Sequence, residues 1–565
     1  MERMSLTDEL REVVRGEVED SPEVLQQYSR DASLFVIQPQ VVVRPMDAQD
    51  VCTVVHLVST KKQAPKSHIS ITARSAGTDM SGGPLNDSII LDMTRHFNRL
   101  IELGDNYTIV EPGMYFRDFD RQTQTKHLEL PSYTASREIN TVGGMVANNS
   151  GGEKNLKYGK TARYVEELEV VLADGQVHTL KCLRGEALRA KCLERSFEGE
   201  VYRALSSLIS TNRDVIEAAK PGVEKNSSGY ALWEMGDGTE SLDLARLMVG
   251  AQGTLGIITK IRFSLINPKP YAAMVIIFLH SLSELGSIVS PVLVHEPDSF
   301  ESYDDHTFTL GVRYFPEFAK QLKMNFISLV LSFLPEMWMV ITGGVPKLVL
   351  MVEFRARSQE EALNKAEDLA EEIEHTNPRV SLRVASSERA TRKYWLLRRE
   401  SFNLLRKKVR GLRTAPFIDD FVVPPQKLSE FLPKLDAILS TYNLTYTITG
   451  HVGDGNFHII PLINPKETRL PHLIDELSHK VYDLVLSYHG SITGEHNDGI
   501  ARTPYVEKMF GPAMYALFHE VKSILDPHNI FNPGKKVGLT FSEALTYLDL
   551  PPQVVVTQTQ ERNQS

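Results

Sequence analysis

The sequence predicts an α+β protein with two large domains, a nucleotide-binding domain over residues 37–268 and a second α+β domain over residues 269–538. From Val41 to about Leu265, short β-branched runs alternate with helical stretches, and glycines gather at the ends of the predicted strands, a pattern typical of nucleotide-binding folds. After Pro268-Lys269-Pro270 the pattern changes to strands and long helices. Because 565 residues are too many for one core, more than one domain is expected.

Hydrophobic periodicity and turn residues predict the individual elements. Residues 1–36 are predicted to form an N-terminal helical segment, because the stretch before Arg30 is acidic and helical in pattern. Residues 539–565 are predicted to form a partly disordered tail, because the chain after Pro551 has no core pattern. Between them we expect strands at Val41–Pro45 and Ile69–Ala73, and helices at Asp47–Leu57, Ser358–His375, Trp395–Leu405 and Gln426–Tyr442.

Composition excludes several classes of partner. The formal net charge is −10 and there is no long basic run, so nucleic-acid binding has no electrostatic support and a small-molecule partner is favoured. The cysteines Cys52, Cys182 and Cys192 lie singly, which excludes a disulfide framework or an iron–sulfur cluster supplied by this chain and indicates a reducing, cytoplasmic location. The N-terminus resembles neither a signal peptide nor a transit peptide.

The most apolar stretch, residues 326–350, is interrupted by prolines and glycines before it reaches the roughly 20 residues of a membrane span. We interpret it as a buried core segment. The alternative is an interfacial patch that faces a membrane or a partner subunit. Peripheral contact with the inner face of a membrane therefore stays open, as does a homodimer.

Three glycine-rich loops in the first domain predict contacts with phosphate groups. They are Arg74–Gly83, Thr141–Gly152 and Gly250–Thr259. Glycines and hydroxyl side chains leave backbone N–H groups free to turn toward a pyrophosphate. Each loop alone could be a structural turn. The sequence lacks a G-x-G-x-x-G between a strand and a helix and a Walker A run, so neither the Rossmann nor the P-loop mode of binding is supported.

The run His451–His458, HVGDGNFH, predicts a metal site together with Gly494-Glu495-His496. Asp454-Gly455 is a strong signal for a two-residue hairpin turn, and a hairpin centred there pairs His451 with His458, whose Cβ atoms would then lie about 5 Å apart. With Glu495 as an oxygen ligand, they form a His/His/Glu set for zinc or manganese. His496 would then be free to act as a base, and Asn456 could orient substrate or metal. The alternative is two ordinary strand histidines and a surface turn.

The three loops, in this order, resemble the FAD-binding domain of the vanillyl-alcohol oxidase superfamily, also called the p-cresol methylhydroxylase (PCMH) type. HVGDGNFH and GEH extend the resemblance to the FAD-linked oxidases that include the glycolate oxidase flavin subunit, D-lactate dehydrogenase and D-2-hydroxyglutarate dehydrogenase. It runs from about residue 20 to residue 538 and closes with Asp526-Pro527 and Phe531–Lys535. It implies a two-subdomain PCMH-type FAD-binding domain, then an α+β substrate or cap domain with a C-terminal helical segment.

The resemblance also implies the cofactor site. FAD would be bound noncovalently, because neither His nor Cys occurs in Arg74–Gly83 or in Pro131–Gly152. The residues expected around FAD are Arg74, Ser75, Ala76, Gly77, Thr78, Asp79, Met80, Ser81, Gly82, Ser136, Thr141, Gly143, Gly144, Asn148, Ser150, Gly253, Thr254, Gly256, Ile257 and Ile258.

In the second domain, the resemblance aligns Arg398 with an arginine that family members use to bind the substrate carboxylate. Arg399 is the neighbouring candidate, and a solvated helix face is the alternative for both. The 2-hydroxyglutarate enzymes carry a lysine where this chain has Ile418, which argues against a dicarboxylate substrate.

By this resemblance, the function expected is FAD-dependent oxidation of a D-2-hydroxy acid of the D-lactate or glycolate type to the 2-oxo acid, with hydride transfer to flavin N5. A quinone, an electron-transfer flavoprotein or an iron–sulfur partner would accept the electrons, and direct use of oxygen is not excluded. Two alternatives stay open. One is an alkylglycerone-phosphate synthase-like enzyme, and the other is a noncatalytic flavin subunit of a larger complex.

Overall fold

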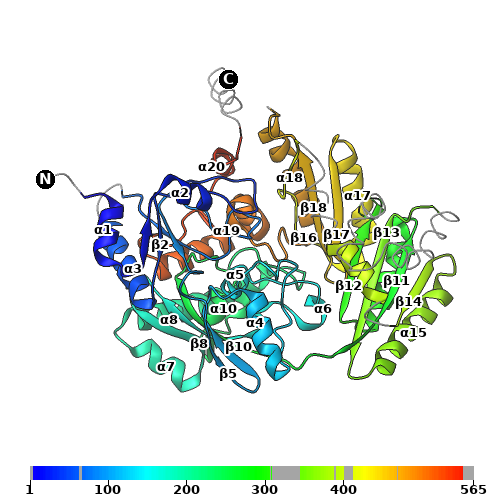
Figure 1. The fold of residues 1–565 in the computed structure, drawn as a ribbon, viewed down its shortest axis with the longest axis horizontal. Coiled ribbons are helices and arrows are strands. Elements are labelled where there is room, and N and C mark those ends of the chain that lie inside the picture. The colour runs from blue at the N-terminus through cyan, green and yellow to red at the C-terminus, as the bar shows by residue number, and fades with distance from the viewer. Residues whose placement is uncertain are drawn as a thin grey trace.

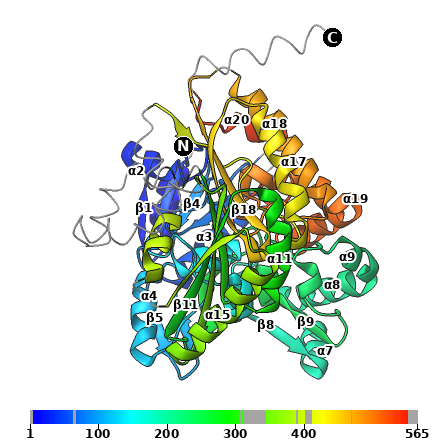
Figure 2. The same ribbon diagram turned by 90° about the vertical axis from the view of Figure 1, so that its right-hand side faces the viewer.

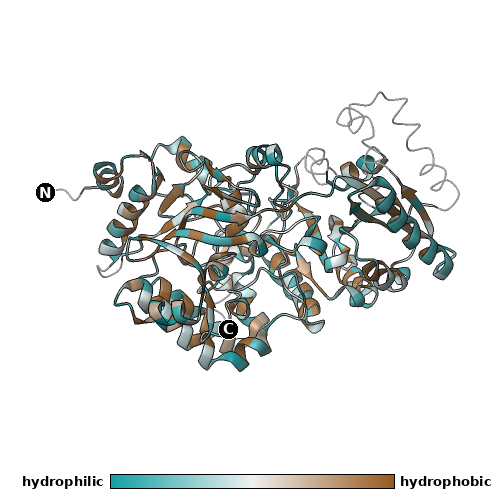
Figure 3. Ribbon diagram, turned by 90° about the horizontal axis from the view of Figure 1, so that it is seen from below, coloured by the Kyte–Doolittle hydropathy of each residue, from teal (hydrophilic) through white to brown (hydrophobic). Residues whose placement is uncertain are grey.

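The structure is a computed structural model that describes residues 4–62, 67–305, 307, 309, 344–386, 390–399, 411–467 and 469–550. Its described strands form three sheets. Two sheets lie in the first half of the chain and the third in the second half, and the halves lie side by side along the long axis (Figure 1). Hydrophobic residues are concentrated in the interior of both halves, whereas the outer helices carry many hydrophilic residues (Figure 3).

The first sheet has the order β1-β2-β4-β3. Strands β2 (Val41–Arg44), β4 (Ile89–Asp92) and β3 (Ile71–Arg74) are parallel, and α3 (Ala48–Lys62) supplies valines to the same core. The described part of residues 1–36, predicted to form an N-terminal helical segment, contains two helices and one short strand. Strand β1 (Glu17–Glu19) lies between α1 (Leu6–Val13) and α2 (Pro22–Tyr28) and pairs antiparallel with β2, so β1 forms an edge of this sheet.

The second sheet is antiparallel, with the order β5-β6-β10-β7-β8-β9. Its strands are β5 (Leu100–Leu103), β6 (Tyr107–Val110), β7 (Val165–Val171), β8 (Val177–Arg184), β9 (Ser241–Asp243) and β10 (Ile257–Ser264). The helices of this region are α4 (Phe116–Thr123), α5 (Val142–Asn148), α6 (Asn155–Tyr158), α7 (Gly185–Leu193), α8 (Phe197–Thr211), α9 (Arg213–Ala219) and α10 (Leu244–Met248). The largest apolar cluster of this half includes residues from β7, β8, α8 and α10.

The third sheet has the order β14-β11-β13-β12-β17-β18-β15, and β16 also pairs with β18. Its strands are β11 (Tyr271–Leu279), β12 (Ser299–Asp304), β13 (Leu348–Ala356), β14 (Ser381–Ala385), β15 (Arg413–Thr414), β16 (Phe421–Val422), β17 (Thr445–His451) and β18 (Asn456–Ile463). Figure 2 shows α11 (Leu285–Val294), α15 (Gln359–Thr376), α17 (Leu428–Ser440) and α18 (Leu470–Ser487) in front of it. Helices α15 and α17 agree with the sequence pattern.

Most of the apolar stretch 326–350 lies outside the described residues, and its last three residues begin β13. In the described part of the chain, none of the helices combines the length and the apolar character needed to cross a bilayer.

The end of the chain returns to the first half. Helix α19 (Gly499–Leu525) contributes Val506, Phe518 and Val521 to the core of the second sheet. In the predicted tail, α20 (Phe541–Thr546) is ordered, and Asp549 forms ion pairs with both Arg30 and Arg413. Residues 551–565 lie outside the described residues. The C-terminal segment therefore joins the two halves.

A half-buried ion-pair cluster in the first half makes stability depend on pH. His178 on β8 lies 2.9 Å from Asp174 (Nε2 to Oδ2) and 3.4 Å from Glu198 (Nδ1 to Oε2). Burial lowers the pKa of His178, but the two carboxylates outweigh it and raise the pKa to about 9. Since this exceeds the unfolded value near 6.5, the stabilisation is complete below about pH 6.5 and is lost as pH rises through 9.

We therefore expect the wild-type protein to lose on the order of 1–2 kcal/mol more unfolding free energy between pH 6 and pH 9.5 than His178→Gln does. Urea unfolding of both proteins at the two pH values measures the difference. Equal losses would show that the His178 cluster contributes nothing to the pH dependence.

Candidate functional site

The three glycine loops meet at one place in the first half. The first follows β3, the second contains α5, and the third precedes β10. Asn148 of the second loop donates its amide to Asp79 of the first loop at 2.7 Å, and Gln252 of the third loop donates to Asn148 at 3.2 Å. Loops whose bonded residues lie 69 and 104 positions apart in the sequence are thus joined side chain to side chain, which is the arrangement a shared cofactor site requires.

Several of the residues expected around FAD hold the loops themselves. Arg74 donates to the carbonyl oxygens of Tyr28 and Arg30 at 2.9 and 2.6 Å, and a Cβ at Gly143 would lie 2.4 Å from Pro112. The other residues expected at FAD fall into three groups. The first loop, after β3, carries Ser75, Ala76, Gly77, Thr78, Met80, Ser81 and Gly82, and the second loop or its surroundings carry Ser136, Thr141, Gly144 and Ser150. The third loop carries Thr254 and Gly256 just before β10 and Ile257 and Ile258 at its start.

Open space beside Gly253 fits a bound cofactor. Gly253 has φ +67°, and a Cβ added there would meet no heavy atom within 4 Å. Gly144 on the second loop is nearly as open, with Thr141 Oγ1 at 3.3 Å as its one near contact. These two glycines leave unfilled space on the loops where the resemblance expects the cofactor, so the residues present fit FAD.

Replacing Gly253 with alanine should weaken FAD binding at least about tenfold, because the new methyl group would point into the space left for the cofactor. Gly185→Ala is a matched control: Gly185 also has positive φ, +51°, and an open Cβ position, so it carries the same backbone strain of about 1–2 kcal/mol. Fluorescence of FAD released on dilution measures both variants. Equal losses of FAD would mean that backbone strain alone explains the effect.

The hairpin that carries the two histidines differs from the predicted one. His451 pairs with Asn456, and His458 pairs with Thr449, so the predicted direct pairing of His451 with His458 was wrong. Residues 452–454 form a 3-10 turn, and of the four loop residues only Gly455 has positive φ, +70°. The histidines are instead diagonal neighbours on one face, and their ring centroids still lie 5.4 Å apart.

Three imidazoles converge on one carboxylate oxygen. The Nε2 atoms of His451, His458 and His496 lie 3.4, 3.2 and 3.8 Å from Oε1 of Glu495. His451 and His458 come from the hairpin, and Glu495 and His496 from the segment before α19. A set of nitrogen and carboxylate oxygen atoms this close together suits a divalent cation of the zinc or manganese type. The four side chains singled out by the sequence therefore do come together.

The opposite nitrogen of each imidazole faces a buried carboxylate. Nδ1 of His451 lies 2.6 Å from Glu301. Nδ1 of His458 and of His496 lie 3.1 and 2.6 Å from the two oxygens of Asp419. A carboxylate on Nδ1 holds the proton there and turns the Nε2 lone pair inward, as is common around protein-bound metals. When the imidazoles are neutral, this placement favours the Nδ1–H tautomers that metal binding and proton transfer need.

Asp420 offers a further carboxylate near this cluster, since its ligand atom lies within 4.8 Å of those of His458, Glu495 and His496. That carboxylate, however, accepts the backbone N–H groups of Glu495 and His496, together with the Thr493 hydroxyl and the Asn456 amide. Its hydrogen-bonding capacity is thereby used. Asp420 therefore shapes the Gly494–His496 segment, and His451, His458 and Glu495 stay the predicted ligand set.

Electrostatics favours positive charge at the cluster. Burial lowers the pKa of His458, but Asp419 and Glu495 outweigh it and raise the pKa to about 10. Burial raises the pKa of Glu495, yet Lys225 and His451 hold it well below the usual range. Lys225 is fully buried, with Nζ 2.9 Å from Glu495 Oε2. The buried Glu495 carboxylate is thus held in its charged form by cationic neighbours.

Arg398 and Asn456, the other predicted catalytic residues, are both engaged. Arg398 lies in the helical residues 390–399 and donates Nε to Glu301 at 2.9 Å, whereas Arg399 pairs with Glu153 of the first half. Asn456 is fully buried and donates to Asp420 at 3.0 Å. Asn456 therefore supports the segment that carries Glu495 and His496.

Asn497 links this cluster to the FAD loops. Its side chain donates to the carbonyl oxygens of Asn148 and Gly250 at 3.2 and 2.8 Å, and its own backbone adopts φ +67°. Gly499 N–H then donates to Gln252 at 2.8 Å. The residue next to His496 is thus bonded to the second and third glycine loops, which brings the imidazole beside the cofactor site.

Sequence reasoning missed Glu301, Lys225 and Asn497 and gave Asp419 no role. Glu301 and Lys225 come from segments far from the histidine motif, and no local spacing marks them. Asp419 was visible as part of the Asp419-Asp420 pair next to a strand. A search for a buried carboxylate to orient each ligand histidine would have singled it out.

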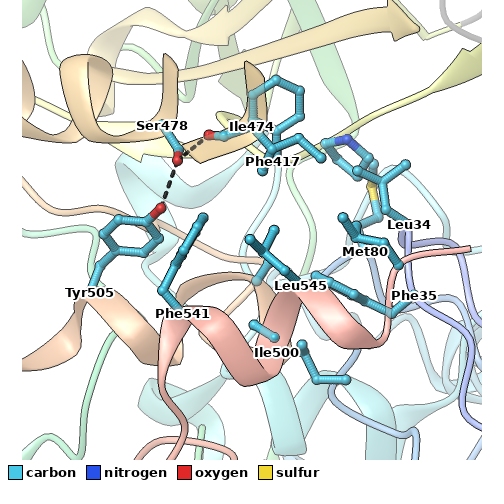
Figure 4. Close-up of a pocket in the computed structure, with 14 residues that line it drawn as sticks. Leu34, Phe35, Met80, Phe417, Ile474, Ser478, Ile500, Tyr505, Phe541 and Leu545 are labelled. Carbon is cyan, nitrogen blue, oxygen red and sulfur yellow. Dashed lines mark hydrogen bonds between the residues drawn. The ribbon is translucent and has the colours of Figure 1, made fainter. Parts of the chain in front are cut away.

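A small apolar pocket lies beside these segments (Figure 4). Met80 comes from the first FAD loop, Phe417 from just before the Asp419-Asp420 pair, and Ile500 from the start of α19. Its two hydroxyl side chains, Ser478 and Tyr505, bond to each other at 2.6 Å. Among the described residues that line the pocket, none is charged.

Two domain families match the chain. The family described as FAD binding domain matches residues 39–181, and the one described as FAD linked oxidases, C-terminal domain, matches residues 269–536. D-2-hydroxyglutarate dehydrogenase of Pseudomonas putida is 28% identical over 92% of this chain and 50% of its own length. Glycolate oxidase subunit GlcD of Bacillus subtilis is 25% identical over 90% of this chain and 91% of its own length.

The D-lactate dehydrogenase of Archaeoglobus fulgidus is 25% identical over 88% of this chain and 91% of its own length. The chain spans only about half the length of the D-2-hydroxyglutarate dehydrogenases that it matches.

Solved structures confirm the predicted fold class. p-Cresol methylhydroxylase with substrate bound has a TM-score of 0.64 at 16% identity, covering 94% of this chain and 96% of its own. An alkyldihydroxyacetonephosphate synthase has the same TM-score, 0.64, at 14% identity, covering 95% of this chain and 86% of its own. At these identities the similarity establishes the fold alone, a PCMH-type FAD-binding domain followed by an α+β domain.

Proposed function

Because residues 269–536 match the family described as FAD linked oxidases, C-terminal domain, we propose that the chain oxidises a D-2-hydroxy acid of the lactate or glycolate type to the 2-oxo acid. The observation that supports this most is the convergence of three imidazoles and Glu495 beside the three FAD loops. Oxidation of a hydroxy acid needs a proton acceptor, a group that polarises the hydroxyl, and a hydride acceptor. When bound, a divalent cation polarises the hydroxyl and FAD accepts the hydride at N5.

His496 is the proposed base. Asp419 holds the Nδ1 proton of His496 at 2.6 Å, so Nε2 is available to take the proton of the substrate hydroxyl. As the imidazole becomes positive, the same carboxylate stabilises the charge. His451, His458 and Glu495 would hold the cation, and Arg398, with its planar guanidinium, would bind the substrate carboxylate.

The group on the substrate's α-carbon is proposed to be uncharged. Ile418, which the resemblance aligns with a lysine of the 2-hydroxyglutarate enzymes, is completely buried in the core of the second half. The apolar pocket next to Phe417 offers no charge to a second carboxylate. A monocarboxylate therefore suits this chain better than a dicarboxylate does.

The electrons are proposed to leave the flavin for a separate acceptor, either a quinone, an electron-transfer flavoprotein or an iron–sulfur protein. The three cysteines are unpaired in the structure. Too few cysteines are present for the chain to supply a four-cysteine cluster of its own.

Anaerobic reduction of the flavin tests this proposal. Purified protein loaded with Zn²⁺ or Mn²⁺ is mixed with D-lactate, L-lactate, glycolate or D-2-hydroxyglutarate, and flavin absorbance is followed. We expect rapid bleaching by D-lactate or glycolate, its loss after chelation of the metal, and its return when the metal is restored. If none of the four acids bleaches the flavin, the ether-synthase or noncatalytic-subunit alternative would replace the proposed reaction.

A further inference from the structure

One buried carboxylate contacts both the proposed metal set and the proposed substrate anchor. Glu301 on β12 is directly opposite His451 on β17 in the antiparallel ladder. Its Oε1 lies 2.6 Å from Nδ1 of His451, and its Oε2 accepts from Nε of Arg398 at 2.9 Å. The Glu301 side chain is 1% exposed, so water does not screen either contact.

Building on the proposed function, we propose that Glu301 is a positioning residue that couples binding of the metal to binding of the substrate carboxylate. On one side, accepting the Nδ1 proton of His451 directs Nε2 toward Glu495 Oε1, 3.4 Å away. The ladder register places the two residues opposite each other, so the backbone itself aligns the contact. Such outer carboxylates commonly contribute 10- to 100-fold to metal affinity.

On the other side, the bond to Nε orients Arg398. A guanidinium is planar, so one bond at Nε to a fixed carboxylate restricts the direction in which the whole group points. The helical residues 390–399 that carry Arg398 reach the sheet at this point. The carboxylate that aligns His451 thus also aligns the group assigned to the substrate.

Sharing of one carboxylate predicts reciprocal effects. A shift of Glu301 toward either partner changes its bond to the other, so metal binding and carboxylate binding should each alter the other's affinity by the same factor. Loss of Glu301 should weaken both, whereas loss of Arg398 should weaken carboxylate binding alone.

The matched control is Glu353. It lies on the neighbouring strand β13, is 4% exposed, and accepts from Trp395 Nε1 at 2.9 Å and from Arg355 Nε at 2.8 Å. Trp395 belongs to the same helical residues as Arg398. Glu353→Gln therefore removes a buried carboxylate that holds the same helix without removing the contact to His451.

Two binding constants test the proposal without turnover. Metal-free holoprotein is titrated with Zn²⁺ in competition with a chromophoric chelator, and pyruvate binding is read from the change in flavin absorbance. For Glu301→Gln we expect Zn²⁺ affinity to fall 10- to 100-fold and pyruvate affinity to fall at least about tenfold. Arg398→Leu should lower only pyruvate affinity, and Glu353→Gln should leave both within about threefold.

Glu301→Gln removes the charge beside Arg398 and could fail to fold. Glu301→Asp keeps the charge and shortens the side chain by one methylene, so it should shift both constants in the same direction by less. The proposal is overturned if the Glu301 variants change the melting temperature while both constants stay within about threefold, or if only one constant changes.

The outcome is separate from that of the proposed reaction. A wild-type protein that binds Zn²⁺ and pyruvate, with both weakened in the Glu301 variants, supports the coupling even if no hydroxy acid reduces the flavin. A wild-type protein that binds neither overturns both proposals.

Discussion

Replacing His496 with alanine should slow reduction of the flavin by the hydroxy acid by about 10²–10⁴-fold. The loss follows from removal of the one proposed ring nitrogen that accepts the hydroxyl proton. Asp419, which lies 2.6 Å from His496 Nδ1, would remain and could not replace that nitrogen at the position of Nε2. Stopped-flow bleaching under anaerobic conditions, at saturating substrate, measures the rate.

The control for this variant is His375→Ala, which removes an exposed histidine at the end of α15. It should reduce flavin at the wild-type rate. FAD content and Zn²⁺ content should be unchanged in His496→Ala, because His451, His458 and Glu495 supply the proposed ligands. Bleaching of His496→Ala within about threefold of wild type would show that another group takes the proton.

Replacing Asp419 with asparagine should produce the second large loss, about 10²-fold or more in flavin reduction. Asp419 accepts from His458 through one oxygen and from His496 through the other. An asparagine offers one oxygen and one amide donor, so one imidazole would have to carry its proton on Nε2. That imidazole could then serve neither as a ligand nor as a base.

Zn²⁺ titration distinguishes the two histidines in this variant. A 10- to 100-fold fall in metal affinity places the altered tautomer on His458, whereas a normal metal affinity with slow reduction places it on His496. Asp298→Asn is the control, since Asp298 is buried but bonds to Tyr158 and to the backbone of Arg355. If Asp419→Asn kept both the wild-type rate and the wild-type metal affinity, Asp419 would not set the tautomers.

The sequence pattern predicted those parts of the site whose residues lie in short motifs. Glycine clusters at strand ends mark the three loops, and the structure bonds Asp79, Asn148 and Gln252 of those loops to one another. His451, His458 and Glu495 were expected together and are found together. Residue type and spacing sufficed to predict these two features, because tight loops at strand ends need glycine and a zinc or manganese site needs imidazole and carboxylate ligands.

The local sequence pattern gave the wrong backbone geometry where contacts between distant residues decided it. The Asp454-Gly455 pair predicts a two-residue turn, but Asn155 from the first half donates to the Asp454 carboxylate at 2.8 Å, and Gly455 packs against the backbone of Val423. The hairpin loop is therefore longer than the predicted two residues and the register of β17 and β18 is shifted, so that His451 pairs with Asn456. Likewise the strand β1 forms an edge of its sheet by pairing with β2.

The sequence by itself determined the fold class, the three glycine loops and the identity of the converging histidines and glutamate, because these depend on periodicity and residue chemistry within short segments. Only the tertiary structure decided which carboxylates orient the imidazoles and which lysine faces Glu495. Glu301, Asp419 and Lys225 reach the site through sheet register and through packing between the two halves. Contacts between residues far apart in the chain produce no motif of fixed spacing in the sequence, so only the folded structure reveals them.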